Sequence, residues 1–297
     1  METRRFVLDY SKAKELLPVR PAEGTKRDFG RVLIIAGSAT MIGCCELAVK
    51  GALRCGAGLV TLAFPDCIYT PLASRLTENL FLPMPSENGK LSAECLPLLF
   101  KAIKRSDVVV FGCGVGLNDD IKEIASELVL KCEKPLILDA DGINALADNI
   151  DVLSHARSKI LLTPHVAEMS RLIKRDIDFI EQNREKVILA VSKKYNVNVL
   201  LKGHKTLISR SDAALVCMNN TGNTGLAKGG SGDLLSGMIA GFTPALNGNL
   251  YQSACLSAYI HGLTAELVSS KMSEYSTLPS DCADNIGYIL KAIIESE

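Results

Sequence analysis

From residue 31 onward, short apolar runs alternate along the chain with longer segments of helical periodicity. Apolar runs of roughly four to eight residues are typical of buried strands, and periodic segments of roughly ten residues or more are typical of helices. The pattern predicts strands at residues 31–36, 59–64, 106–111, 135–139, 159–163, 197–201 and 206–209, and helices at residues 44–55, 119–131, 181–195, 232–246, 253–269 and 284–295. Residues 1–29, which Pro18, Pro21 and Gly24 interrupt, are expected to form an irregular N-terminal arm.

This alternation indicates an α/β fold with a mainly parallel sheet and helices on both faces. No low-complexity linker or internal repeat divides the sequence, so residues 1–297 are expected to form a single domain. Folds of this class bind ligands at the carboxyl ends of their strands. The segments that follow the strands should therefore converge on one edge of the sheet: residues 37–43, 112–116, 139–144, 163–168, 202–206 and the loop before Gly232.

The richest of these segments is NNTGNTGLAKGGSGDLLSG at residues 219–237. Its glycines allow backbone N–H groups to converge, and the apolar helix that follows brings the positive end of its dipole, so the segment predicts a phosphate cradle. Asp233 adds a negative charge beside such an anion. It either accepts the proton of a substrate hydroxyl that attacks a phosphoryl group, or caps the helix N-terminus.

Two better-known phosphate motifs are absent from the sequence. No G-x-x-x-x-G-K-[ST] occurs, which excludes a P-loop protein. Residues 112–116 read G-x-G-x-G rather than G-x-G-x-x-G, which disfavours an ordinary dinucleotide-binding dehydrogenase.

The composition of the chain limits the kinds of partner it is expected to bind and the cellular compartment in which it is expected to occur. The 33 basic residues balance 33 acidic ones, which argues against a general affinity for nucleic acid or acidic membranes. No apolar run reaches the roughly 20 residues that span a bilayer, and the charged N-terminus is unlike a signal peptide. Ten scattered cysteines without metal-site spacing are expected to be buried thiols in a reducing cytoplasm.

Several polar side chains near the strand ends have open interpretations. Asp139 and Asp141 are either a carboxylate pair for a metal, or a turn cap and a loop-packing residue. Glu168 and Arg171 have the spacing of an exposed ion pair on a helix. Lys202 at a strand end is, on its own, a solvated side chain.

The chain resembles the ADP/ATP-dependent NAD(P)H-hydrate dehydratases, a metabolite-repair family. The likeness runs from about residue 31 to the end in segments that keep their order. They are GRVLIIAGSATMIG (30–43), GALRCGAGLVT (51–61), FGCGVGL (111–117), LDADGINAL (138–146), LTPHVAEMSRL (162–172), VLLKGHKTLI (199–208), NTGNTGLAKGGSGDLLSGMIAG (220–241) and YIHGLTAEL (259–267).

The resemblance implies a ribokinase-like three-layer αβα fold and a lyase reaction. NADHX and NADPHX, the hydrated forms of the reduced nicotinamide cofactors, would be phosphorylated on the ring hydroxyl from ADP or ATP. Phosphate would then leave and restore NADH or NADPH. ADP is the favoured donor, Mg²⁺ is expected with the nucleotide rather than on protein ligands, and a homotetramer is expected.

The resemblance also assigns residues. Asp233 takes the position of the catalytic base. The positions that match nucleotide contacts are Lys202, Gly203, His204, Lys205, Thr206 and Gly232. The positions that match contacts to the hydrated dinucleotide are Cys44, Gly114, His165 and Asp233.

This sequence departs from the family pattern at a few positions. Cys44 and Cys45 stand where small alanines are usual, Cys113 replaces a proline, and Gly142 replaces an alanine. None of these changes removes a catalytic group, although a thiol near the site raises the question of its reactivity. The chain also begins almost directly with the kinase-like domain, so no epimerase domain is expected in front of it.

Two other functions compete with this interpretation. The first is an ATP-dependent kinase of the same fold that acts on a vitamin-precursor alcohol such as hydroxyethylthiazole. The second is a nucleotide-binding regulator that has lost catalysis, which an intact Asp233 in an intact glycine loop argues against.

Overall fold

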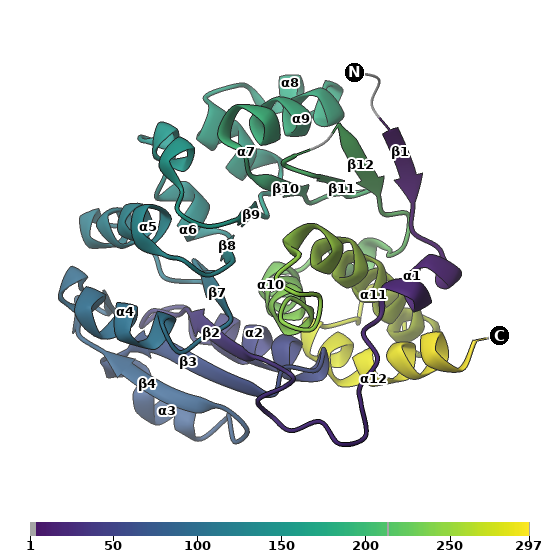
Figure 1. Cartoon of the computed structure of the whole chain (residues 1–297), viewed down its shortest axis with the longest axis horizontal. Coiled ribbons are helices and arrows are strands. Elements are labelled where there is room, and N and C mark those ends of the chain that lie inside the picture. Colours follow the sequence, from purple (N-terminus) through teal and green to yellow (C-terminus); the bar gives the residue numbers. More distant parts are fainter. Residues whose placement is uncertain (1–3, 213, 297) are drawn as a thin grey trace.

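A ten-stranded sheet forms the centre of the molecule in the computed structural model, which describes residues 4–212 and 214–296 (Figure 1). The strand order is β1-β12-β11-β10-β9-β8-β7-β2-β3-β4, and all neighbours are parallel except β10–β11 and β11–β12. These strands are β1 (Arg4–Val7), β2 (Arg31–Ile35), β3 (Leu59–Pro65), β4 (Leu80–Met84), β7 (Val108–Phe111), β8 (Leu136–Leu138), β9 (Ile160–Leu162), β10 (Asn198–Leu201), β11 (Leu207–Ser209) and β12 (Leu215–Met218). A separate hairpin joins β5 (Ser86–Glu87) to β6 (Lys90–Leu91).

Helices cover both faces of this sheet. They are α1 (Tyr10–Leu16), α2 (Gly43–Arg54), α3 (Tyr69–Ala73), α4 (Leu96–Ile103), α5 (Asp119–Lys131), α6 (Asp141–Asn144), α7 (Val166–Ile173), α8 (Ile177–Gln182), α9 (Arg184–Tyr195), α10 (Ser231–Phe242), α11 (Leu250–Lys271) and α12 (Pro279–Glu295). The short 3₁₀ turns are η1 (Asp66–Ile68), η2 (Ala93–Cys95), η3 (Ile150–His155) and η4 (Thr224–Leu226). In Figure 1 the curved sheet wraps around α2, α10, α11 and α12, while α4, α5, α7 and α9 lie outside it.

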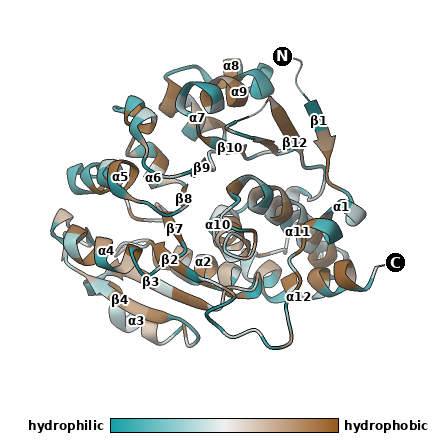
Figure 2. Cartoon of the chain, viewed as in Figure 1, coloured by the Kyte–Doolittle hydropathy of each residue, from teal (hydrophilic) through white to brown (hydrophobic). Residues whose placement is uncertain are grey.

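The strand side chains divide between two hydrophobic cores, one on each face. In β2, Val32 and Ile34 enter the core shared with α2, α10, α11 and α12, while Leu33 and Ile35 enter the core shared with α4, α5 and α9. Burial on both faces explains why these strands are continuous apolar runs, seen as brown arrows in Figure 2. The predicted three-layer αβα fold with a mainly parallel sheet is therefore confirmed.

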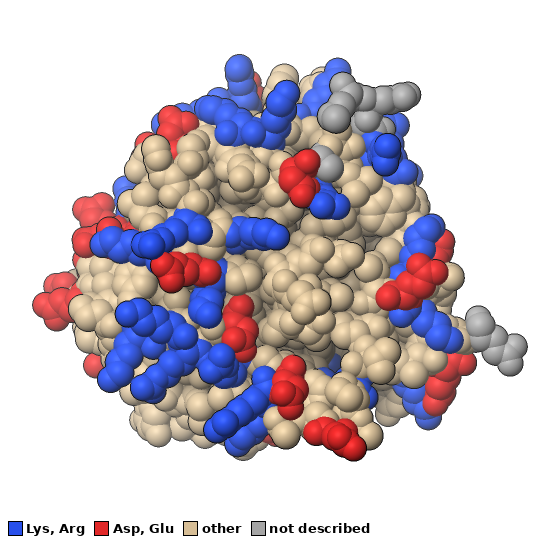
Figure 3. Space-filling model, viewed as in Figure 1, with Lys and Arg blue, Asp and Glu red and all other residues tan. Residues whose placement is uncertain are grey.

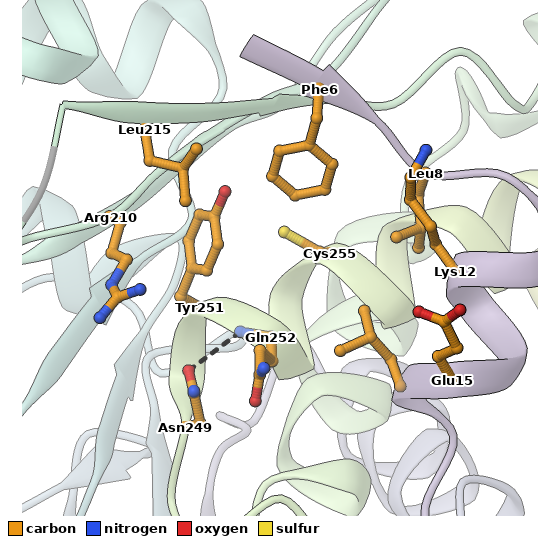
Figure 4. Close-up of a pocket in the computed structure, with 11 residues that line it drawn as sticks. Phe6, Leu8, Lys12, Glu15, Arg210, Leu215, Asn249, Tyr251, Gln252 and Cys255 are labelled. Atoms are coloured by element: carbon orange, nitrogen blue, oxygen red, sulfur yellow. Dashed lines mark hydrogen bonds between the residues drawn. The ribbon is translucent and has the colours of Figure 1, made fainter. Parts of the chain in front are cut away.

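The N-terminal arm is more regular than the sequence predicts. Strand β1 pairs in parallel with β12, and α1 begins after Asp9, whose side chain accepts a hydrogen bond from Lys12 N (2.9 Å). Figure 4 shows Phe6 of β1 facing Tyr251 and Cys255 of α11 across a cavity of about 280 Å³. The expectation of an irregular arm is wrong for these segments because their partners lie more than two hundred residues away in the sequence.

Two other differences have local causes. The helix predicted at residues 181–195 is interrupted at Asn183, which has a φ of −127° and separates α8 from α9. The sequence pattern does not predict strand β4, because Pro83 interrupts it. This strand lies at the edge of the sheet, where a residue without an N–H is tolerated.

The structure also tests the predictions about cysteines and charge. All ten cysteines lie in the described part of the chain, are unpaired and, except for Cys67, are buried. On the face drawn in Figure 3, acidic and basic side chains both occur at the rim and near the middle, and a larger uncharged area lies to the right of the middle. Among the residues that the structure describes, no helix has both the length and the apolar character to cross a membrane.

Candidate active site

Helices α2 and α10 pack very closely against each other because small residues line their contact. A Cβ added to Gly237 of α10 would overlap the carbonyl oxygen of Ala48 in α2, and one added to Gly241 would lie 2.5 Å from the carbonyl oxygen of Ala52. These contacts advance in the same direction along both helices, so α2 and α10 run parallel. Their N-termini therefore lie together at the carboxyl ends of the strands.

Helix α10 begins on a backbone conformation that favours glycine. Gly230 has a φ of +99°, and a Cβ there would lie 2.5 Å from the Cδ1 atom of Leu47. The first intrahelical hydrogen bond runs from Leu234 N to Gly230 O (3.0 Å), so the N–H groups of Gly232 and Asp233 precede it. Unpaired N–H groups at a helix N-terminus attract anions.

The loop that leads into α10 is fastened to α11. A Cβ on Gly262 would overlap Thr221 Oγ1, so this glycine lets the loop lie directly on the helix. Asn219 Nδ2 donates to Ala258 O (3.1 Å), and Gly222 N donates to Glu266 Oε1 (2.6 Å). The YIHGLTAEL segment (residues 259–267) of α11 thus packs against the glycine-rich loop and holds it in place.

Asp233 is the third residue of α10, and the N-cap position belongs to Gly230. The interpretation of Asp233 as a helix cap is therefore wrong, and its carboxylate is left for another use. Burial, and then the nearby charge of Asp139, raise the pKa of Asp233 to about 6, although a hydrogen bond from Cys113 and the charge of Lys202 oppose the rise. At neutral pH the group is ionised and is a stronger proton acceptor than an ordinary carboxylate.

Beside Asp233 lies an ion pair between the buried Asp139 and the partly buried Lys202. Asp139, 1% exposed, accepts hydrogen bonds on Oδ1 from Lys202 Nζ (2.7 Å) and Thr163 Oγ1 (2.8 Å), and on Oδ2 from Ser236 Oγ (2.8 Å). The Lys202 ammonium is also 3.7 Å from Glu168 Oε2. Burial would lower the pKa of Lys202, but the Asp139 and Glu168 charges raise it overall, so the side chain carries a charge.

These contacts decide between the interpretations left open by the sequence. The Asp139 side chain neither pairs with Asp141 nor caps a turn; it accepts a hydrogen bond from Lys202, whose side chain is 19% exposed and so mostly removed from solvent. Asp141 packs the loop, since its Oδ2 accepts from Gly116 N (2.8 Å).

His165 begins helix α7 at the edge of this network. Its Nδ1 accepts from Ala167 N (3.1 Å) and Glu168 N (3.2 Å), while Glu168 Oε2 accepts from His165 N (2.8 Å). Burial lowers the pKa of His165, which favours the neutral imidazole. The predicted exposed pair of Glu168 with Arg171 is wrong: Glu168 is buried in this capping box, and Arg171 Nε donates to Asn144 Oδ1 (2.9 Å).

The segment from Lys202 to Thr206 leaves this network for the surface. Gly203, His204 and Lys205 are exposed. Arg184 of α9 supports the loop from behind, since Nη1 donates to His204 O (2.6 Å) and Nη2 to Leu201 O (3.3 Å). A Cβ on Gly232 would lie 3.2 Å from Lys202 Nζ, so this segment adjoins the start of α10.

Cys44 and Gly114 form the side of the site next to α2. Gly114 has a φ of +63°, and a Cβ there would overlap Cys44 Sγ. The thiol donates to Met41 O (3.1 Å) and Cys113 O (3.2 Å). A hydrogen bond with Cys45, together with burial, raises the pKa of Cys44, so it stays a protonated thiol rather than a reactive thiolate.

The structure places the predicted site residues on α2, on α10 and in the loops after β7, β9 and β10, and it brings Gly114 against Cys44 and Lys202 against Gly232. It adds Thr163, Ser236 and Arg184, which sequence reasoning did not assign. Thr163 follows a strand and could have been found by the strand-end rule. Ser236 and Arg184 lie within helices and carry no local signal.

Comparisons with known proteins agree on one family. Residues 32–287 match the sequence model of the NAD(P)H-hydrate dehydratases. The chain is 33% identical over 293 residues to the bifunctional NAD(P)H-hydrate repair enzyme Nnr of Moorella thermoacetica, covering 98% of this chain and 55% of that protein. It is 30% identical to the ADP-dependent (S)-NAD(P)H-hydrate dehydratase of Neisseria meningitidis serogroup B, covering 90% and 87%.

A solved structure extends the likeness to three dimensions. The ADP/ATP-dependent NAD(P)H-hydrate dehydratase of Bacillus subtilis, co-crystallised with ATP and Mg²⁺, superimposes with a TM-score of 0.82 at 26% identity. The match covers 97% of this chain and 98% of the other. The chain thus spans about half the length of the bifunctional relative and nearly all of the single-function ones.

Proposed function

The chain belongs to the NAD(P)H-hydrate dehydratase family, and from that premise we propose that it dehydrates NADHX and NADPHX with ADP, in preference to ATP, as phosphoryl donor. One observation carries the proposal: the Asp233 carboxylate lies at the start of α10 without serving as its N-cap, beside N–H groups suited to a phosphate. The preference for ADP is supported by the Neisseria relative, whose name specifies ADP.

In this proposal Asp233 takes the proton of the ring hydroxyl as its oxygen attacks the terminal phosphoryl group. The P–O bond to the donor breaks, and AMP leaves when ADP is the donor. The N–H groups of Gly232 and Asp233 stabilise the charge that develops on the transferred group. Inorganic phosphate then leaves with the electron pair of its C–O bond, the neighbouring ring carbon loses a proton to water, and the ring double bond returns. Phosphorylation permits this step because phosphate is a far better leaving group than water.

The remaining contacts follow the two sides of the site. The nucleotide would lie along Gly232 and the segment Lys202, Gly203, His204, Lys205 and Thr206, which meet at the start of α10. The hydrated dinucleotide would lie on the side formed by Cys44, Gly114 and His165. The neutral His165 imidazole suits a hydrogen bond to ribose or diphosphate.

Mg²⁺ fits this site only as an ion carried by the nucleotide. Oxygens of Asp139 and Asp233 lie within 4.8 Å of each other and of Cys113 Sγ, but both Asp139 oxygens already accept hydrogen bonds and a thiol is a poor Mg²⁺ ligand. The phosphates and water would hold the ion, and its charge would offset that of the phosphates.

A homotetramer and a cytoplasmic location remain predictions from the resemblance and from the ten unpaired cysteines. Sedimentation of the purified protein would measure the first. Fractionation of the cells that make it would test the second.

The first experiment follows the absorbance band of NADH. Purified protein is mixed with chemically prepared NADHX and Mg²⁺, and ADP or ATP is supplied separately. Absorbance that grows only with nucleotide, together with release of phosphate, would support the dehydratase and identify its donor. A flat trace with both nucleotides, from protein that binds ADP, would favour the kinase of a vitamin-precursor alcohol, an interpretation that the family match disfavours.

The pH dependence of the reaction should report Asp233. Because the base must be ionised and its pKa is raised to about 6, we expect kcat/KM to fall by roughly tenfold per pH unit below that value. Rates measured across a series of buffers at constant ionic strength check this. A rate that stays level well below this midpoint would mean that another group accepts the proton.

Gly203→Val should weaken nucleotide binding. Gly203 has a φ of +144°, which L-residues rarely adopt, and a Cβ there would lie 3.2 Å from Nη2 of Arg184. A side chain would therefore displace the exposed loop at a cost of about 1 to 3 kcal/mol, or a roughly tenfold to hundredfold higher Kd for ADP. Calorimetric titration measures the Kd, and a melting curve checks folding. Unchanged affinity would place the nucleotide elsewhere.

A further inference from the structure

Asp139 joins elements of the site that are distant in the sequence. Its carboxylate binds Thr163 at the end of β9, Lys202 at the end of β10 and Ser236 in the second turn of α10. Thr163 and Ser236 are themselves almost fully buried. A single carboxylate thus fastens the helix that carries Asp233 to the edge of the sheet.

Asp139 cannot itself be the base of the reaction. It is 1% exposed, and each of its oxygens already accepts a hydrogen bond, one of them from an ammonium group. Any effect on the reaction must therefore pass through its neighbours. Two paths exist: the position of α10, and the electric field at Asp233.

We propose that Asp139 is a positioning residue for Asp233, which fixes the first turns of α10 and, with Lys202, balances two opposite charges beside the catalytic carboxylate. This rests on the proposed function, in which Asp233 is the base. Asp139 and Lys202 then form one ion pair whose two charges act in opposite directions on the ionisation of Asp233.

The charges around Asp233 come from four sides of the site. The groups that face it are Asp139 and Asp141 after β8, Lys202 at the end of β10, Cys113 after β7 and Cys44 at the start of α2. Glu168 and His165 of the α7 capping box face Lys202 in turn. Asp139 raises the pKa of Asp233 and Lys202 lowers it, so removal of either charge should move that pKa in a known direction.

The fall of kcat/KM at low pH, which we call the acid limb, reports the pKa of Asp233. Asp139→Asn and Lys202→Met should therefore shift this limb in opposite directions. Without the Asp139 charge the limb moves to lower pH, and without the Lys202 charge it moves to higher pH, each by roughly one unit. Turnover should also fall by roughly ten- to a hundredfold in Asp139→Asn, because α10 loses its anchor. The double variant, which removes both charges, should bring the limb back between the two.

Matched controls remove a hydrogen bond and keep the charge. Ser236→Ala and Thr163→Val each delete one donor to Asp139, so we expect lower turnover or a lower melting temperature but an unmoved limb. If Asp139 only stabilised the fold, Asp139→Asn would behave like these controls. If Asp139→Asn alone fails to fold, the double variant, which removes both members of the ion pair, keeps the test open, because its limb should lie at lower pH than that of Lys202→Met.

A readout without substrate separates this inference from the proposed function. Carbon NMR of ¹³C-labelled aspartate follows the titration of Asp233 directly, with Asp233→Asn to assign its signal. Opposite shifts of that titration in the two variants support this role of the ion pair even if NADHX is not the substrate. An active enzyme whose Asp233 titration and acid limb stay fixed in both variants would overturn it.

Discussion

Asp233→Asn should lower turnover by roughly 10² to 10⁴-fold while nucleotide still binds. Asparagine has the same shape but cannot accept a proton at neutral pH. The change should leave α10 intact, because Gly230 rather than Asp233 occupies the N-cap position. Removal of a negative charge near the phosphates should leave ADP affinity unchanged or higher. Steady-state kinetics and calorimetric titration measure the two effects.

Asp119→Asn is a suitable control for this change. Asp119 is also an aspartate in the first turn of a helix, but it is exposed on α5. We expect near-normal turnover from this variant. Near-normal turnover from Asp233→Asn as well would remove Asp233 from the mechanism, and loss of ADP binding would mean that the change disrupts the cradle itself.

Much of the site could be predicted because strand ends of a parallel sheet must meet at one edge. Short apolar runs identified β7, β8, β9 and β10, and the residues after them include Gly114, Asp139, His165 and Lys202. The strand-end rule needs only the local pattern, so one sequence suffices for it.

Contacts between distant segments could not be predicted in this way. The bond from Ser236 to Asp139 joins residues 97 positions apart, and the pairing of β1 with β12 spans more of the chain still. Glu168 shows a different limit. Its spacing from Arg171 fits an ion pair, but the start of α7 uses its carboxylate for a capping box, and burial near Lys202 completes that environment.

The glycines near Asp233 show that a sequence motif alone does not tell what each of its residues does. Gly230 and Gly232 belong to the start of α10, as the phosphate-cradle interpretation predicts. Gly237 and Gly241 continue the same glycine-rich segment but serve the packing of α10 on α2. The sequence does not distinguish these purposes, because both need a residue without a side chain.

Gly237→Ala should therefore lower the stability of the protein by roughly 3 kcal/mol, near the upper end for overpacked cores. The added Cβ would overlap the carbonyl oxygen of Ala48, a backbone atom that cannot rotate away, so α2 and α10 must move apart. Since Cys44 and Asp233 stand at the N-termini of these helices, activity should fall with stability. Chemical denaturation gives the free energy of unfolding of each variant.

Gly287→Ala makes the same substitution where space is open. Gly287 lies on α12, and a Cβ there would meet no atom within 4 Å. Alanine favours a helix over glycine by up to about 1 kcal/mol, so this variant should be as stable as the parent or more stable. Opposite signs for the two variants would show that close contact of α2 and α10, rather than helix propensity, selects glycine at position 237. If both variants gained stability, the two helices could separate at no cost, and their spacing would not be what holds Asp233 in place.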